Sequence, residues 1–167
     1  FGMKNRDEAR QSGKKWFPYN KGGEFRKWYG NQEFVVNWEN DGEEIRNFSF
    51  DNGKQRSVVR NPDYYFRESV SWSKISSGSL AMRFFPNGFL FDVAGCSLFS
   101  DSHSTDMKVL GLTNTQIIRE ILAVMSPTLN FEVGQISNIP YPVNDKADVG
   151  TIENLLRMAI DDWDSFE

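Results

Sequence analysis

The chain has 167 residues, a formal net charge of −4, 39% hydrophobic and 25% charged residues, and one cysteine. This length allows one domain with a real core and hardly two, and the composition is typical of a soluble globular protein. The lone Cys96 excludes an internal disulfide and a cysteine-rich zinc site, and it suits a reducing cytoplasm. No apolar run approaches the roughly eighteen residues of a membrane helix, so we expect no membrane partner.

Charge is unevenly distributed along the chain. Residues 1–83 contain 15 Lys and Arg against 11 Asp and Glu, whereas residues 84–167 contain 4 against 12. The first half therefore carries a balance of +4 and the second half −8. A basic half can face a polyanion, although two halves of opposite charge can also simply face each other.

Residues 1–13 are polar and without periodicity, which predicts a flexible lead-in. The basic–aromatic segment, residues 14–29, interleaves cations with large rings and contains the turn signal Gly22-Gly23. Cations contact phosphates, rings stack on bases, and the bare amides of "NKGG" allow a phosphate to approach closely. This segment is the best sequence candidate for nucleic-acid binding; the alternative is a solvated loop whose aromatics belong to the core. Its candidate contacts are Lys14, Lys15, Asn20, Lys21, Arg26 and Lys27.

Residues 33–38, "EFVVNW", predict a strand, and a short helix is expected around Glu43–Asn47. Further on, residues 61–64, "NPDY", differ by one residue from the Asn/Asp-Pro-Pro-aromatic tetrapeptide of enzymes that methylate the amine of adenine in DNA. Such an enzyme also needs a doubly wound sheet with a glycine-rich turn after its first strand. The glycines before Asn61 instead lie among lysines and aromatics, and Asn-Pro commonly opens a turn, so a surface turn is predicted.

Residues 64–75 are predicted to be extended and to lead into the loop "SSGS". In residues 79–93, apolar side chains alternate on both sides of Asn87-Gly88, which predicts a β-hairpin. Three residues ahead of this hairpin are further candidates for DNA contact: Lys74, Ser76 and Ser77. Arg83, within it, is a candidate for reading a guanine edge, or alternatively for pairing with an acid.

Residues 107–112, "MKVLGL", predict a short apolar strand. A helix is expected next, with Thr113 and Gln116 as a capping box and Ser126-Pro127 at its end. Residues 128–133, "TLNFEV", predict a return strand, which would complete a strand–helix–strand unit. The final helix has Asp148 as its cap and one apolar face, formed by Ile152, Leu155, Leu156, Ala159, Ile160 and Trp163. Together these patterns predict an α+β fold with a mixed, mostly antiparallel sheet of short strands and two main helices.

No catalytic constellation emerges from the residue types. A metal-dependent nuclease needs a second carboxylate two positions before its lysine, and Trp72 stands there ahead of Lys74. His103, the single histidine, lies in the polar stretch "SDSHSTD" and is expected to be a solvated loop residue. We therefore predict no catalytic residue and no metal site in this chain.

Three long stretches carry a resemblance to a known family: residues 18–45, residues 71–99 and residues 110–143. They resemble the C-terminal target-recognition region of adenine-specific DNA methyltransferases of bacterial phage defence, of the BREX-type, PglX-like family. The last stretch is more distantly similar to the specificity domains of Type I and Type IIG restriction-modification proteins. The resemblance covers roughly residues 14–167, and the closing "DDWDSFE" is similar to a family stretch that normally continues, as in a truncated piece.

The resemblance implies a non-catalytic recognition domain at residues 14–146 and a C-terminal helix at residues 147–167. Its implied partners are double-stranded DNA, a separate catalytic domain that binds S-adenosylmethionine, and other defence-system subunits, all in the bacterial cytoplasm. The final helix either packs on that catalytic domain or on its own sheet. The alternative function is a protein-interaction module that docks another subunit of the defence complex.

Overall fold

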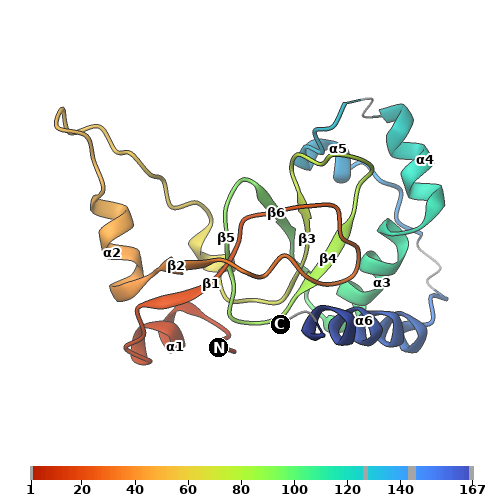
Figure 1. The fold of residues 1–167 in the computed structure, drawn as a ribbon, viewed down its shortest axis with the longest axis horizontal. Helices are drawn as coiled ribbons and strands as arrows, with labels where there is room; N and C mark the ends of the chain where they lie inside the picture. Colours follow the sequence, from red (N-terminus) through yellow and green to blue (C-terminus); the bar gives the residue numbers. More distant parts are fainter. Residues whose placement is uncertain (1, 126–127, 143–145, 166–167) are drawn as a thin grey trace.

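The structure is a computed structural model that describes residues 2–125, 128–142 and 146–165. Its strands form two separate three-stranded sheets, ordered β2-β1-β5 and β4-β3-β6 (Figure 1). The first sheet consists of β1 (Trp16–Asn20), β2 (Val35–Asn37) and β5 (Leu90–Phe91), and the second of β3 (Ser69–Ser73), β4 (Met82–Phe85) and β6 (Gly95–Leu98). Of the four pairings between these strands, only β1–β5 is parallel. The predicted α+β class is confirmed.

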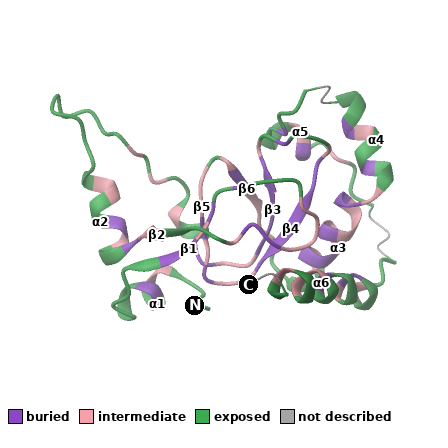
Figure 2. Ribbon diagram, in the orientation of Figure 1, coloured by how far each residue is buried: buried purple, intermediate pink, exposed green. Residues whose placement is uncertain are grey.

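The helices are divided between the two sheets (Figure 1). Beside the first sheet lie α1 (Arg6–Gln11) and α2 (Glu39–Asn47), and beside the second lie α3 (His103–Thr113), α4 (Gln116–Met125), α5 (Val133–Ile136) and α6 (Val149–Asp164). Each sheet has its own core, so the buried residues fall into two clusters (purple in Figure 2). Phe17, Phe66 and Leu90 belong to the first, and Met82, Met107 and Leu110 to the second.

Several predicted elements are confirmed. The strand expected at residues 33–38 is β2, and the short helix around residues 43–47 is the regular part of α2, because Asn40, Asp41 and Gly42 have φ angles of 51°, 61° and 76°. The last helix begins after Asp148, whose carboxylate accepts a hydrogen bond from the Gly150 amide. The helix after residue 115 is α4, and its predicted end at Ser126-Pro127 lies outside the described residues.

The predicted hairpin at residues 79–93 is wrong. A turn does form at Asn87-Gly88, where Gly88 has a φ of 111°. However, β4 pairs with β3 while β5 pairs with β1, so the chain crosses from one sheet to the other at this turn. The amide of Gly88 donates to the carbonyl of Phe66, and the amide of Phe66 donates to the carbonyl of Phe89. A neighbouring segment therefore takes the hydrogen bonds that a hairpin would have made.

The predicted strand at residues 107–112 is also wrong, because these residues form the last two turns of α3. The helix begins earlier, where the Ser102 hydroxyl accepts a hydrogen bond from the Thr105 amide. The buried residues of α3 recur at helical spacing: Asp106, Met107, Leu110 and Thr113. This spacing is visible only when the polar first turn of the helix, before residue 107, is included in the pattern. The fold accordingly has a third long helix, where two were expected.

Three smaller expectations are corrected as well. The Thr113 hydroxyl donates back to the carbonyl of Val109 and so does not form a capping box with Gln116. Residues 128–133 form only an isolated bridge, Ile75–Asn130, rather than a strand, so the strand–helix–strand unit is absent from the described residues. The expected lead-in at residues 1–13 contains α1, whose Ala9 is buried in the first core.

Helix α6 packs on α3 of its own domain. Ile152 and Leu156 are buried in the second core, and a Cβ added to Gly111 of α3 would lie only 2.6 Å from Cδ1 of Ile152. The two helices are therefore in close contact here, and a side chain on Gly111 would require Ile152 to shift. Of the two packing arrangements considered for this helix, the structure contains the one within the chain, against a helix rather than a sheet.

Candidate nucleic-acid interface

The basic–aromatic segment, residues 14–29, does not present a continuous row of free cations. Lys15 lies 3.6 Å from the carboxylate of Glu39. Arg26 lies 3.4 Å from Asp162 and stacks 4.8 Å from the ring of Trp163. These acids come from other parts of the chain, so two of the segment's five cations are paired with acids within the domain.

Lys27 is also engaged, because its Nζ donates to the carbonyl of Asn114 at 2.8 Å. Partial burial and the nearby Arg119 lower the pKa of Lys27. Lys14 and Lys21 are exposed, and the ammonium of Lys21 lies 5.5 Å from the ring of Phe34. Of the segment's cations, these two remain the most accessible to a phosphate.

Arg83 is buried, with 1% of its surface exposed. Its guanidinium donates to the carbonyl of Arg26 at 3.2 Å and to the Ser73 hydroxyl at 2.9 Å, and that hydroxyl donates to the carbonyl of Gly23. Burial lowers the pKa of Arg83 to about 10, with a small opposing effect of Glu33. In this conformation Arg83 holds the glycine turn of the basic–aromatic segment against β3 and has no path to a base edge.

Asn20 is likewise an interior residue, 1% exposed. Its side-chain amide donates to the Ser71 hydroxyl at 2.6 Å and its oxygen accepts from the Gly22 amide at 3.1 Å. Asn20 ends β1 of the first sheet, whereas Ser71 is in the middle of β3 in the second. This buried amide therefore joins the two sheets, and a structural role replaces the expected phosphate contact.

The remaining candidates, Lys74, Ser76 and Ser77, lie apart from Lys14 in different surroundings. Lys74 forms an ion pair with Glu132 at 3.1 Å. Ser76 is buried and its hydroxyl donates to the carbonyl of Ser79 at 3.4 Å, whereas Ser77 is exposed. Lys74 lines the same cavity as Tyr19 of the basic–aromatic segment, but its ammonium is held by Glu132.

The tetrapeptide at residues 61–64 forms a turn, as predicted. Asn61 has a left-handed φ of 50°, and Pro62–Tyr64 make one turn of 3₁₀ helix. Asp63 points toward α1, 3.3 Å from a guanidinium nitrogen of Arg6. Its surroundings are those of a surface turn.

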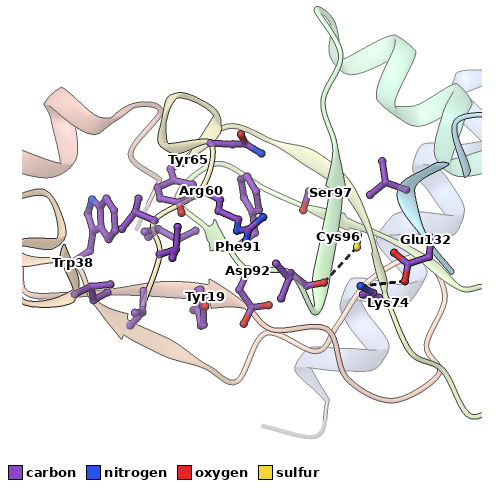
Figure 3. A pocket seen from close by; sticks show the side chains of 18 residues that line it. Tyr19, Trp38, Arg60, Tyr65, Lys74, Phe91, Asp92, Cys96, Ser97 and Glu132 are labelled. Carbon is purple, nitrogen blue, oxygen red and sulfur yellow. Dashed lines mark hydrogen bonds and ion pairs between the residues drawn. The ribbon is translucent and has the colours of Figure 1, made fainter. Parts of the chain in front are cut away.

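A cavity of about 540 Å³ lies between the two sheets (Figure 3). Trp38, Tyr65 and Phe91 line one part of it, and the ion pair Lys74–Glu132 closes the other. Burial and the adjacent Asp92 raise the pKa of Tyr19 well above its ordinary value, so its hydroxyl stays protonated. The rings of Trp38 and Phe91 pack edge-to-face against Tyr65.

The part of the chain that stands furthest from both sheets is an arm, residues 48–60 (orange to yellow in Figure 1). It is exposed along most of its length (green in Figure 2). The Phe50 amide donates to the carbonyl of Lys54, and the Arg56 amide to that of Phe48, so the arm is a short two-stranded ribbon. Gly53, with a φ of 79°, supplies the left-handed conformation that its tight turn needs.

The arm carries three cations, Lys54, Arg56 and Arg60, against one acid, Asp51. The Arg56 guanidinium lies 4.7 Å from the ring of Phe48 and 4.6 Å from that of Phe50. Sequence reasoning missed this element. The signal was present, since "FSFDNGKQR" alternates aromatic and polar residues before an Asn-Gly turn and then adds two cations.

Metal chemistry finds no support in the described residues, where no group of three or more His, Cys, Asp and Glu side chains is placed to hold an ion. His103 is the first residue of α3 rather than a loop residue, and its Nδ1 lies 3.3 Å from Glu68. None of the helices in the described part of the chain is both long and apolar enough to span a bilayer.

No protein-family profile matches the chain. It is 44% identical over 156 residues, 92% of its length, to the adenine-specific methyltransferase PglX of Lacticaseibacillus casei (strain Zhang). It is 36% identical over 167 residues, 96% of its length, to the adenine-specific methyltransferase BrxX of Escherichia coli O9:H4 (strain HS). The chain spans 13% of the length of each of these proteins. It is therefore homologous, over most of its own length, to one segment of adenine-specific methyltransferases.

Proposed function

We propose that this chain is the DNA target-recognition part of a bacterial adenine-specific DNA methyltransferase that acts in phage defence, and that it does not itself transfer the methyl group. The observation that carries the proposal is the homology of nearly the whole chain to two proteins named as adenine-specific methyltransferases. In this proposal the parent protein binds S-adenosylmethionine, and the present chain contributes to the choice of DNA site.

The fold supports a division between recognition and chemistry. A methyl donor with an adenosyl group is bound by a doubly wound parallel sheet with a glycine-rich turn after its first strand. The described sheets have three strands each and one parallel pairing, between β1 and β5. The proposal accordingly places the methyl-donor site in another part of the parent, since the chain spans only 13% of the length of its two relatives.

A salt titration of duplex binding tests this function. Each phosphate neutralised by Lys or Arg releases counterions, so the logarithm of the affinity for a 30-base-pair duplex should fall linearly with the logarithm of salt concentration, by about 0.9 per contact. Fluorescence anisotropy between 25 mM and 300 mM NaCl measures the slope. Binding that is absent at the lowest salt, or that does not respond to salt, contradicts the proposal.

A protein-docking function is the second candidate, and α4 favours it. Ile117 and Val124 are 70% and 84% exposed, and their spacing of seven residues places them on one face of the helix. In this alternative that face docks another subunit of the defence complex. Replacing both residues with serine should weaken pull-down of that subunit after nuclease treatment and leave duplex affinity unchanged. Unchanged association removes the support for this alternative.

A further inference from the structure

We propose that the arm, residues 48–60, enters the major groove of duplex DNA and carries the base-reading contacts of this domain. The inference rests on the proposed function and adds the part of the molecule that performs it. It replaces the basic–aromatic segment as the centre of the interface, because that segment's cations are mostly held by the domain's own acids and carbonyls.

The dimensions of the arm fit this role. Its ladder consists of the bridge between Ser49 and Gln55 and the flanking amide hydrogen bonds, so it is a single two-stranded ribbon. The major groove, about 12 Å wide, admits an α-helix or a two-stranded ribbon, whereas proteins that enter the minor groove, about 6 Å wide, commonly bend or kink the DNA. At the tip, a Cβ built on Gly53 would have no neighbour within 4 Å. Nothing in the described structure covers the tip.

The base of the arm is fixed while its tip is free. The Gln55 side-chain amide donates to the carbonyl of Arg46 at 3.0 Å, and the Ser57 hydroxyl donates to that of Ile45 at 2.6 Å. Both acceptors belong to α2, so the ribbon projects from a helix in a defined direction. A reading element held this way loses less conformational entropy on binding than a free loop does.

The side chains of the arm have the chemistry of groove recognition. Arg56 lies against two phenyl rings that orient its guanidinium, and the structure gives it no carboxylate partner in the described residues. An oriented guanidinium pairs with the N7 and O6 acceptors of guanine. The side-chain oxygen of Asn52 accepts from the Lys54 amide at 3.0 Å, so its NH₂ group is the part that can donate to a base acceptor. The Lys54 ammonium, next to the turn, reaches a phosphate. Phe48 and Phe50 are half-exposed, and their role in this proposal is to hold the Arg56 guanidinium in place.

Two duplexes of one mixed sequence test the inference. In one of them the cytosines carry glucosylated 5-hydroxymethyl groups, which fill the major groove and leave the minor groove open. The wild-type chain should bind the filled duplex at least about tenfold more weakly. The double variant Lys54→Gln/Arg56→Gln should bind the unmodified duplex about tenfold more weakly than wild type and should no longer distinguish the two duplexes.

A matched control removes the same charge elsewhere. Lys4 lies before α1 and Arg10 within it, and both are exposed cations. Lys4→Gln/Arg10→Gln should change the affinity for each of the two duplexes less than twofold. Urea unfolding of both double variants verifies that they fold. If the arm variant binds and discriminates like wild type, the arm is not the reading element, while the proposed function stands. If the wild-type chain binds neither duplex at 25 mM salt, the proposed function itself fails. Equal binding of both duplexes by wild type, with salt dependence retained, overturns the major-groove assignment alone.

Discussion

Replacing the buried Arg83 separates a structural role from a base-reading role. Its pKa of about 10, against an ordinary 12.5, corresponds to roughly 3 kcal/mol of desolvation cost, present in full at pH 7 because Arg83 is charged in both states. Two hydrogen bonds from a charged donor, to Arg26 and Ser73, return about 1.5–3 kcal/mol each. The two hydrogen bonds together contribute about 3–6 kcal/mol, so they offset the desolvation cost or exceed it by up to about 3 kcal/mol. We therefore expect Arg83→Met, which keeps most of the apolar stem, to lower the free energy of unfolding by at most about 3 kcal/mol.

Arg83→Ala should be much less stable than Arg83→Met. It leaves a cavity beside β3, and removing a buried side chain of that size costs about 2–5 kcal/mol. Urea unfolding followed by tryptophan fluorescence measures both variants, and duplex affinity is measured alongside. Because Arg83 is 1% exposed, Arg83→Met should retain wild-type affinity. A stable Arg83→Met variant with more than tenfold weaker binding would refute this reasoning and restore Arg83 as a reader of DNA. Equal stability of Arg83→Met and Arg83→Ala would also refute it, because it would show that packing of the Arg83 stem contributes nothing to the free energy of unfolding.

Three further predictions concern other buried groups. Asn20→Ala should lower the free energy of unfolding by about 2 kcal/mol in urea titrations, because it leaves the hydroxyl of Ser71 and the amide of Gly22 short of a hydrogen-bond partner. An unchanged urea midpoint would contradict the role of Asn20 in joining the two sheets. Burial, opposed by a hydrogen bond from Ser100, raises the pKa of Asp106, so the folded state binds its proton more tightly and stability is lost as pH rises through that range. Asp106→Asn should therefore raise the urea midpoint at pH 7, and a gain that does not shrink toward pH 4 would argue against this cause. Cys96 is buried with a raised pKa, so a thiol reagent at pH 8 should label it far more slowly in the folded chain than in urea; equal rates would show that the site opens freely.

Local signals in the sequence identified the elements that depend on local chemistry. Asp148 caps α6, the Asn61-Pro62 turn forms, and the apolar spacing of α4 gives a helix, because each is decided within a few residues. The residues 87–88 also turn as expected. What the turn joins is decided elsewhere, since β5 pairs with β1, about seventy residues earlier in the chain.

The candidate site was harder to predict for the same reason. Arg26 and its partner Asp162 are 136 residues apart, so composition could show a basic half and an acidic half but not which cations would be paired. Burial of Arg83 and Asn20 follows from the meeting of two sheets, which no local pattern encodes. The arm was overlooked because its three cations are less conspicuous than the lysines of residues 14–29.

The crossing at Asn87-Gly88 has a mechanical consequence. The chain leaves β4 of one sheet and enters β5 of the other within a few residues, which links the two sheets at this turn. The hydrogen bond from Asn20 to Ser71 links them at a second place. Arg83, which joins the glycine turn after β1 to β3, and the bridge between Trp28 and Arg83 add further links. These links leave little freedom for hinge bending, so we expect a force on the tip of residues 48–60 to be transmitted through the first sheet to the second and on to α6. Binding at the tip of residues 48–60 would therefore change the position of α6 as well.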